Sequence, residues 1–476
     1  MCKYLFSKTV ILISALMLLG ACVSSGGYSN PWKINSKNSA TAQQAPSTLA
    51  DPNIWAEQNN GQTDNGEMIL SANGQQKPAG SEYYSPYRGN VDYGADGYTN
   101  NLQMDNSLYG MPPSPAASVR VALLAPMSGQ AAHLGKAFVN ASQMALFDLK
   151  MADFEVAPYD TKSTPQGAEE AARQAISDGA SLIIGPLFAD SVRRARAVAS
   201  RHNVSVLGFS TDWTTASSNS YVMGFMPFTQ VQRIVQHAAQ KGYHRIGVIA
   251  PDDVYGQAVV NTYLEEATRY GLDTVSILRY TAGQDDISLR MREFSQYDSR
   301  RDEKGELFER YELPFDAVLM AVGSEQAIAI SNLLTFHDLD PHRVKRLGTG
   351  LWDDPALAGE DNLRGAVFAA PSPNLRQSFV SRYKMLYNAE PPRLASLAYD
   401  ATALSIVLAK HGLGQNGVPA FGRDYLTNPN GFSGVDGIFR FHSNGLIERG
   451  LAVLELDRGR IKVIEDAPST FMRPRM

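Results

Sequence analysis

The sequence predicts an α/β protein in which mostly parallel sheets carry helices on both faces, arranged in two lobes. Short apolar runs rich in Val, Ile, Leu and Ala recur from residue 119 onward, and between them apolar residues recur at every third or fourth position. The first pattern is typical of buried strands and the second of one helix face. The whole alternation restarts after Pro227, which indicates a second lobe of the same kind.

The unit at 119–149 illustrates the pattern. An apolar run at 119–125 predicts a strand, and a turn follows at Met127-Ser128-Gly129. A helix is expected next, because one apolar face repeats through Leu134, Phe138, Ala141, Ala145 and Leu149. Loops between a strand and a helix form the ligand-binding edge of an open α/β sheet, since the helix N-terminus there offers unpaired N–H groups.

The remaining elements follow in order. In the first lobe, strands and helices are expected alternately at 154–159, 165–178, 181–184, 190–202 and 204–207. In the second lobe we expect a helix after Pro227, elements at 245–250, 256–270, 274–278 and 316–322, and an exposed, mixed-charge helix or insertion at 300–310. Further elements are expected at 365–369, 375–388 and 394–410. Asn-Gly and Arg-Gly turns separate the last strands, at 434–441, 451–457 and 460–464, and predict antiparallel hairpins at the edge.

Composition and charge exclude several classes of protein. The net charge is −5, and no clustered positive face is evident, so nucleic acid is not expected as a partner. The densest basic group, around Arg193 and Arg201, fits a solvated helix face better than an anion site. Both cysteines, Cys2 and Cys22, lie in the first segment, and the eight histidines are scattered. No disulfide in the folded part and no metal site are therefore expected.

Two glycine patterns resemble nucleotide sites only in part. Gly129 and Gly135 lie between a strand and a helix, but their spacing is one residue too long for a phosphate loop. Ala137 also stands where a Ser or Thr must reach magnesium. The residues 412–417 match the dinucleotide pattern, but they follow a helix, which predicts a helix end and a loop.

No catalytic motif remains. No Gly-x-Ser-x-Gly elbow occurs, and no histidine lies at a telling spacing from a Ser or Cys. Acidic pairs fall at turns or helix starts, where helix capping explains them better than acid/base catalysis does: Asp252-Asp253, Asp285-Asp286 and Asp353-Asp354. We therefore expect neither a catalytic residue nor a cofactor.

The N-terminal segment has the features of an export signal. Lys3 and Lys8 precede an apolar core at 9–19 that is too short to span a bilayer comfortably. Leu19-Gly20-Ala21-Cys22 resembles the lipobox of bacterial lipoproteins, in which the cysteine is lipidated and becomes the new N-terminus. An ordinary signal peptide with a chance cysteine is the alternative. Val23 follows, not Asp, which by resemblance to enterobacterial sorting favours the periplasmic side of the outer membrane. We expect residues 1–21 to be removed and Cys22 to anchor the chain.

Residues 22–118 predict a disordered polar tether. Asn, Gln, Ser, Gly, Tyr and Pro dominate this segment, charges are sparse, and no apolar period persists. Such a composition cannot bury enough apolar surface to offset the entropy of ordering. The aromatic clusters near Trp55 and Tyr84 fit a solvated linker, with short docking motifs as the alternative.

Motifs among the predicted elements resemble those of type I periplasmic binding proteins, with the branched-chain amino-acid receptors as soluble relatives. They are Ala-Pro-x-Ser-Gly at 125–129, Ile-Gly-Pro at 184–186, Tyr-Gly at 255–256 and Gly-x-x-Gly-x-x-x-Phe at 434–441. The resemblance implies one domain at 119–476 whose two lobes are joined by three crossovers and close on a ligand. Lobe one would comprise about 119–227 and 347–435, and lobe two about 228–346 and 436–465.

The resemblance also implies a set of ligand-binding residues. In the receptors, backbone N–H and hydroxyl groups of lobe one bind an amino acid's carboxylate, and a tyrosine from lobe two covers it. By position these are Ser128, Gly129, Gly185, Ser210 and Thr211, with Tyr255 from lobe two and Asp353 near the hinge. Pro, Leu, Phe and Ala follow Gly185, where the amino-acid receptors place a serine, so the expected carboxylate donor is missing.

A lipoprotein leader, a polar linker and such a head together resemble the penicillin-binding protein activator family, outer-membrane lipoproteins that stimulate peptidoglycan synthases. The best-known enterobacterial members carry a helical-repeat domain before the binding-protein-like domain, and here the tether takes its place. The implied function is regulation of a periplasmic peptidoglycan synthase. The alternative is a periplasmic solute receptor for amino-acid or amide uptake, with an amino-acid-like ligand.

Overall fold

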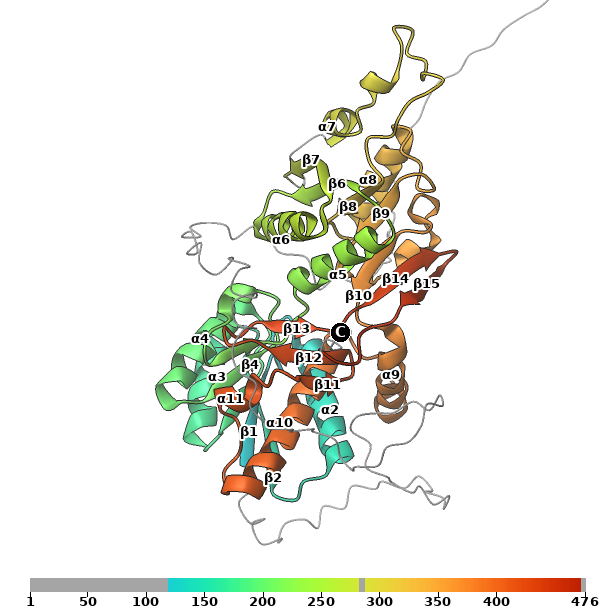
Figure 1. Cartoon of the computed structure of the whole chain (residues 1–476). Helices are drawn as coiled ribbons and strands as arrows, with labels where there is room; N and C mark the ends of the chain where they lie inside the picture. The colour runs from blue at the N-terminus through green and yellow to red at the C-terminus, as the bar shows by residue number, and fades with distance from the viewer. Residues whose placement is uncertain (1–118, 282–286, 472–476) are drawn as a thin grey trace, which may run out of the picture. The chain divides into compact units, whose positions relative to one another are not determined.

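The computed structural model describes residues 119–281 and 287–471 (Figure 1). The predictions for the leader at 1–21, for Cys22 and for the polar segment at 22–118 lie outside the described residues. Within the described ranges, no helix is long and apolar enough to cross a membrane. The elements form two α/β lobes, each with its own sheet, and a small third sheet.

The first lobe has a parallel sheet in the order β2-β1-β3-β4-β5. Helices α3 and α4 pack together over one face, and α2 packs against α10 over the other (Figure 1). Because both faces are covered, the strands are continuous apolar runs. The bounds are β1 Val119–Ala125, α2 Ala132–Leu149, β2 Phe154–Asp160, α3 Pro165–Ser177, β3 Leu182–Ile184, α4 Ala189–Ala199, β4 Ser205–Gly208, β5 Ser220–Val222 and α10 Ala395–Asn416.

The second lobe has a seven-stranded sheet in the order β15-β14-β10-β9-β8-β6-β7. Its first five strands in sequence are parallel, and β14 and β15 add an antiparallel hairpin at one edge. Helices α5 and α6 cover one face, and α7 and α8 the other. The bounds are α5 Pro227–Gln240, β6 Arg245–Pro251, α6 Val254–Tyr270, β7 Asp273–Tyr280, α7 Ile287–Phe294, β8 Ala317–Met320, α8 Ser324–Phe336, β9 Lys345–Gly348, β10 Val367–Ala370, β14 Ala452–Asp457 and β15 Arg460–Glu465.

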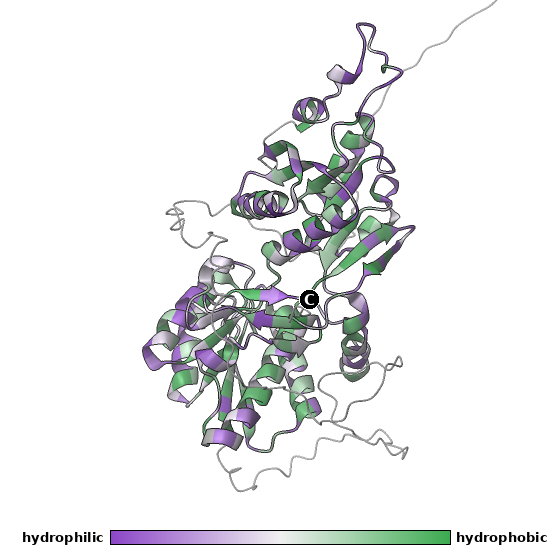
Figure 2. Cartoon of the chain, viewed as in Figure 1, coloured by the Kyte–Doolittle hydropathy of each residue, from purple (hydrophilic) through white to green (hydrophobic). Residues whose placement is uncertain are grey.

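Local sequence signals set the helix ends. Thr164 caps α3 by accepting a hydrogen bond from the N–H of Gly167 at 3.0 Å, and Pro165 follows as the first helical residue. Asp253 caps α6 in the same way at 2.8 Å, and Gly271 ends that helix in the left-handed conformation. The hydropathy follows the helix period, with apolar residues on the strands and on the inward helix faces (Figure 2).

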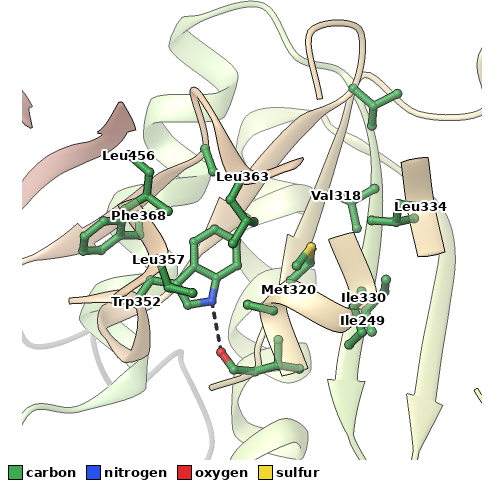
Figure 3. Close-up of a cluster of buried hydrophobic side chains, with 14 of the residues drawn as sticks. Ile249, Val318, Met320, Ile330, Leu334, Trp352, Leu357, Leu363, Phe368 and Leu456 are labelled. Atoms are coloured by element: carbon green, nitrogen blue, oxygen red, sulfur yellow. Dashed lines mark hydrogen bonds between the residues drawn. The ribbon is translucent and has the colours of Figure 1, made fainter. Parts of the chain in front are cut away.

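Trp352 anchors the segment after β9 in the core of the second lobe (Figure 3). Its ring is fully buried, and its indole N–H donates to the carbonyl of Val322 at 3.0 Å. A Cβ on Gly348 would lie 2.2 Å from this ring, so only glycine fits there. The chain from β9 through β10 therefore belongs to the second lobe.

The expected lobe boundaries are corrected accordingly. From the sequence, 347–435 was expected in lobe one and 436–465 in lobe two. In the structure β9 and β10 are strands of the second sheet, so the return to lobe one comes after Ala370. The chain crosses again only after β13, because residues 432–449 form the small sheet β11-β12-β13, and Gly445 there accepts a hydrogen bond from Val222 of lobe one. The crossovers are thus near 223–226, 371–372 and 450–451.

The C-terminal region differs from the expectation in two further ways. The Ser443-Asn444-Gly445 turn joins β12 (Gly437–Phe441) to β13 (Ile447–Arg449), not to the strand at 452–457. Residues 412–416 continue α10 rather than forming a loop, and Gly417 ends the helix in the left-handed conformation. The remaining elements are β11 Phe432–Gly434, α9 Pro373–Tyr387 and the short α11 Arg423–Leu426.

The segment at 300–310 of the second lobe was expected to be an exposed helix or an insertion. The structure has a short turn there and a bridge between Arg301 and Leu307, in place of a helix.

Candidate functional site

The seven candidate ligand residues lie at the carboxyl edges of the two sheets. In the first lobe they follow β1, β3 and β4, three neighbouring strands, and β1 marks the point where the strand order reverses. Ligands of open α/β sheets bind at such a point. In the second lobe Tyr255 follows β6 and Asp353 follows β9. The structure therefore brings Ser128, Gly129, Gly185, Ser210 and Thr211 to one edge, as expected from the sequence.

The turn at Ser128 is bound to a carboxylate of the same chain. Asp160, at the end of β2, accepts hydrogen bonds from the N–H and the hydroxyl of Ser128 at 3.1 and 2.6 Å. It also accepts the N–H of Lys162 at 2.7 Å. Partial burial acts to raise the pKa of Asp160, but these hydrogen bonds outweigh it and the pKa lies below its usual value. An internal anion thus occupies the donors that the family resemblance assigns to a ligand carboxylate.

A second set of hydrogen bonds fastens the same turn. The hydroxyl of Ser163 donates to the carbonyl of Ser128 at 2.7 Å and accepts the N–H of Ala131 at 3.2 Å. Lys162 and Ser163 both adopt left-handed backbone conformations, which cost free energy for residues with side chains. Gly129 has a positive φ of 82°, and a Cβ there would lie 2.9 Å from the carbonyl oxygen of Lys162. The two loops are therefore built as one closed unit.

Gly185 is required by close packing. Its φ is 81°, and a Cβ would lie 2.3 Å from the carbonyl oxygen of Leu124 in the neighbouring strand. Its own N–H donates to the carbonyl of Leu207 at 2.9 Å and is not available to a ligand. Beyond it Leu187 is nearly buried and Phe188 is 40% exposed. This part of the edge offers apolar surface instead of a hydroxyl donor.

Ser210 and Thr211 differ in their exposure. Ser210 is buried, and its hydroxyl accepts the N–H of Asp212 at 3.0 Å, whereas Thr211 is exposed. Asp212 in turn pairs with Arg193 at 2.5 Å. Arg193, expected on a solvated face, therefore fixes the loop after β4. The next residue, Trp213, contacts Phe228 of α5 with ring centroids 5.2 Å apart.

Tyr255 is held within its own lobe. Its hydroxyl shares a hydrogen bond of 2.8 Å with the hydroxyl of Thr349, which is buried after β9. Burial is the main cause that raises the pKa of Tyr255 above its usual value. The tyrosine is thus a neutral hydroxyl with a partner already in place.

Asp353 leads to a buried charged cluster that was not predicted from the sequence. Its carboxylate lies 3.4 Å from Arg393, just before α10, and Arg393 also pairs with the fully buried Asp436 at 3.0 Å. The hydroxyl of Ser396 donates to Asp436 at 2.6 Å. We call Asp353, Arg376, Arg393, Asp400, Asp436 and Arg449 the hinge cluster.

The hinge cluster surrounds the first crossover. The guanidinium groups of Arg393 and Arg449 lie 4.3 and 4.9 Å from the ring centroid of Phe225, a geometry that favours cation–π attraction. Arg449 also donates to the carbonyl of Met223 at 2.7 Å. Residues beside the first and third crossovers, and Asp353 of the second lobe, thus meet in one set of charges.

The burial of these charges shifts their pKa values. Burial, assisted by the charge of Asp436, raises the pKa of Asp400 to about 7. Asp436 is equally buried, but the arginines Arg393, Arg376 and Arg449 keep its pKa below the usual value. Burial lowers the pKa of Arg376 to about 10. Asp436 is therefore the carboxylate that balances the arginines, and Asp400 is the one that holds a proton near neutral pH.

One sequence signal could have identified part of this cluster. Asp400 is the one charged residue in a mostly apolar stretch of α10, between Ala398 and Leu404, and a carboxylate at such a position needs a partner. It accepts the N–H of Val435 at 2.8 Å. The arginines carry no such signal, because their partners come from distant segments.

The polar groups of the candidate site are largely satisfied from within. Ser128 and Tyr255 bind other side chains of the chain, and Asp353 joins a structural ion pair. Among residues 119–281 and 287–471, no group of His, Cys, Asp and Glu is placed to hold a metal ion. The arrangement is a two-lobed binding-protein framework in which the chain supplies its own hydrogen-bond partners.

The fold and this edge define a protein of the two-lobed binding class. The chain belongs to the periplasmic binding protein family, whose sequence model matches residues 118–460. The solved structures agree at the level of the fold. A protein assigned to branched-chain amino acid ABC transport in Rhodospirillum rubrum is 18% identical with a TM-score of 0.62, covering 73% of this chain and 99% of that one. A branched-chain amino acid ABC transporter periplasmic ligand-binding protein from Burkholderia xenovorans LB400 is 17% identical with a TM-score of 0.58, covering 74% and 95%.

A curated relative is named as a penicillin-binding protein activator and not as a transport protein. The chain is 27% identical over 149 residues to the penicillin-binding protein activator LpoA of Photobacterium profundum. This match covers 31% of the chain and 24% of the relative, so the chain spans about a quarter of the relative's length.

The family model and the solved structures together confirm the type I periplasmic binding protein fold that was predicted from the sequence.

Proposed function

We propose that the chain is a periplasmic lipoprotein of the outer membrane that binds and regulates a peptidoglycan synthase, without catalytic activity of its own. The similarity to a penicillin-binding protein activator supports the class of partner. The lipobox-like sequence ending at Cys22 supports the anchor, and the polar segment that follows supports a tether long enough for reach.

One observation favours this function over amino-acid uptake. The donors of the Ser128 turn are bound by Asp160, so an amino acid's carboxylate would have to displace a carboxylate of the chain. Leaving that interaction broken costs free energy, as any lost charge-assisted hydrogen bond does. Gly185 likewise has its N–H bound, and no hydroxyl follows it before Ala189. A head of this kind serves better as a surface for a protein partner.

Site-specific photo-crosslinking in cells tests the proposed partner. A photoreactive amino acid would replace exposed apolar residues in each lobe: Phe147 of α2 (71% exposed), Met385 of α9 (78%) and Phe336 of α8 (74%). Glu312, whose side chain is 94% exposed, is the matched control in a charged region. We expect at least one apolar position, but not Glu312, to trap a peptidoglycan synthase. Absence of any wall synthase from all three positions would contradict the proposal.

A thermal-shift screen distinguishes the proposed function from the alternative, a solute receptor. A solute receptor at a hundredfold excess of ligand over its dissociation constant gains about 2.7 kcal/mol of stability. We expect no such gain with single amino acids or amides. A clear stabilisation by one of them would favour the solute receptor instead.

The membrane anchor has its own test. Replacing Cys22 with Ala removes the thiol that lipidation needs, so the protein is expected in the soluble periplasmic fraction instead of the outer membrane fraction. Immunoblots of fractionated cells measure this. As a control, Cys2→Ala should leave the distribution unchanged, because residue 2 lies within the segment expected to be removed. Unchanged fractionation of Cys22→Ala would rule out the lipid anchor.

A further inference from the structure

A polar cavity of about 510 Å³ lies in the first lobe at the edge opposite the candidate ligand residues. It is lined by residues at the amino ends of three neighbouring parallel strands and by the loop after α10: Ser181, Ser200, Asn203, Ser205, Ser218, Asn219, Pro419, Phe421, Gly422 and Arg423. Its volume falls in the range of ligand pockets, ~300–1,000 Å³. Because it lies at the opposite edge of the sheet, the cavity is separate from the candidate ligand site.

The lining excludes several ligand classes. Among the described residues that form the wall there is no carboxylate, so a ligand ammonium group would find no counter-charge. Arg423 is the single charged residue of this lining, and one of its amino groups donates to the carbonyl of Ser443 at 3.1 Å. This leaves too little positive charge for a phosphate. The serines and asparagines present polar groups that a lipid chain could not satisfy. A neutral, polar ligand fits best.

The hydrogen-bonding groups have a defined pattern. The hydroxyls of Ser181 and Ser205 donate to main-chain carbonyls of Arg120 and Phe421 at 3.1 and 3.0 Å, so their lone pairs remain to accept. The side-chain oxygen of Asn219 accepts from Ser217 at 3.1 Å, which leaves its amide N–H groups to donate. The lining thus offers both acceptors and donors. Sugar hydroxyls, which donate and accept at once, complement such a wall.

A glycine singled out in the sequence builds one wall. A Cβ on Gly412 would lie 2.2 Å from the carbonyl oxygen of Val418 and 2.3 Å from the nitrogen of Ala420. The glycine therefore lets the loop at 418–422 pass directly over α10, and the Ser205 hydrogen bond then joins this loop to β4. Gly414, two positions further along the helix, has no atom within 4 Å of its Cβ position. The near-match to a dinucleotide pattern thus has a packing reason at Gly412.

We propose that this cavity binds a neutral carbohydrate. Hydroxyl and amide groups of the wall hydrogen-bond to the sugar hydroxyls, and Pro419 contributes an apolar surface for a C–H face of the ring. This inference stands apart from the proposed protein partner, since it concerns another edge of the lobe and is measured with small molecules.

Ligand-observed saturation-transfer NMR with the full-length chain tests the proposal. The probes are tri-N-acetylchitotriose and maltotriose, with leucine as the charged comparison. We expect transfer to at least one trisaccharide and none to leucine through this cavity. Ser218→Phe fills the cavity but keeps the main-chain carbonyl that accepts from the Tyr221 hydroxyl at 3.1 Å. It should weaken binding at least tenfold. Ser299→Phe, at another exposed serine but in the second lobe, should bind as the wild type does.

A pair of glycine variants gives an independent comparison. Gly412→Ala displaces the loop wall and should lose trisaccharide binding, whereas Gly414→Ala should keep it. Circular dichroism shows whether each variant is folded, and Ser218→Phe remains decisive if Gly412→Ala is not. Absence of transfer to both trisaccharides overturns the proposal. Unchanged binding by Ser218→Phe, or its loss in Ser299→Phe, overturns it as well.

Discussion

Replacing Asp436 with Asn is expected to destabilise the protein by about 3–5 kcal/mol, the usual cost of breaking a buried ion pair. Asp436 is fully buried and balances Arg393, and the charges of Arg376 and Arg449 also act on it. Asparagine has the same shape and can still accept from Ser396, so the variant removes the charge without opening a cavity. Urea unfolding near neutral pH measures the loss.

Asp353→Asn is the matched control for this prediction. Asp353 pairs with the same arginine, but the distance is 3.4 Å and its side chain is 29% exposed. Solvent screens such a pair, and its loss should cost less than about 1 kcal/mol. Equal destabilisation by the two variants would contradict the assignment of Asp436 as the main counter-charge.

Replacing Asp400 with Asn is expected to change how stability depends on pH. Burial raises the pKa of Asp400 to about 7 from the ordinary value of 3.8. In the unfolded chain the proton is lost near pH 4, whereas the native state keeps it to about pH 7. Between these values the native state binds more protons, so stability falls as pH rises. At about 1.4 kcal/mol per pKa unit the loss reaches about 4 kcal/mol.

An asparagine side chain at this position cannot ionise and avoids the loss. Its oxygen can still accept the N–H of Val435. We expect the melting temperature of the variant to exceed that of the wild type by a clearly larger margin at pH 8 than at pH 5. Other titrating groups are common to both proteins and cancel in the difference. A constant difference between Asp400→Asn and the wild type from pH 5 to pH 8 would refute the prediction.

Most of the fold could be predicted from the sequence because its signals are local. Apolar runs, helical periods and turn residues lie within a few positions of one another, so β1, α2 and α6 fall close to their expected ranges. The lobe boundaries could not be predicted in this way. They depend on which sheet β9 and β10 join, and this is decided by the burial of Trp352 against residues far along the chain.

The location of the candidate residues at the strand ends could be predicted from the sequence, but their hydrogen-bond partners could not. Strand ends and the family resemblance place Ser128, Gly185 and Tyr255 at the carboxyl edges of the sheets. They form hydrogen bonds to Asp160, Leu207 and Thr349. The nearest pair in the sequence, Gly185 and Leu207, is 22 residues apart, and the most distant, Tyr255 and Thr349, is 94 residues apart. No local pattern reports such pairings. The hinge cluster was missed for the same reason.

The packing of α10 on α2 has a consequence for synthesis. The first lobe begins the described fold, yet α10 and the small sheet that complete it are made only after strands β6 to β10 of the second lobe. A growing chain must therefore hold α2 with one apolar side uncovered while the second lobe emerges and folds. The lobe translated first is thus completed only after five strands of the other lobe have been made, and a chain released before residue 416 would carry that uncovered surface permanently.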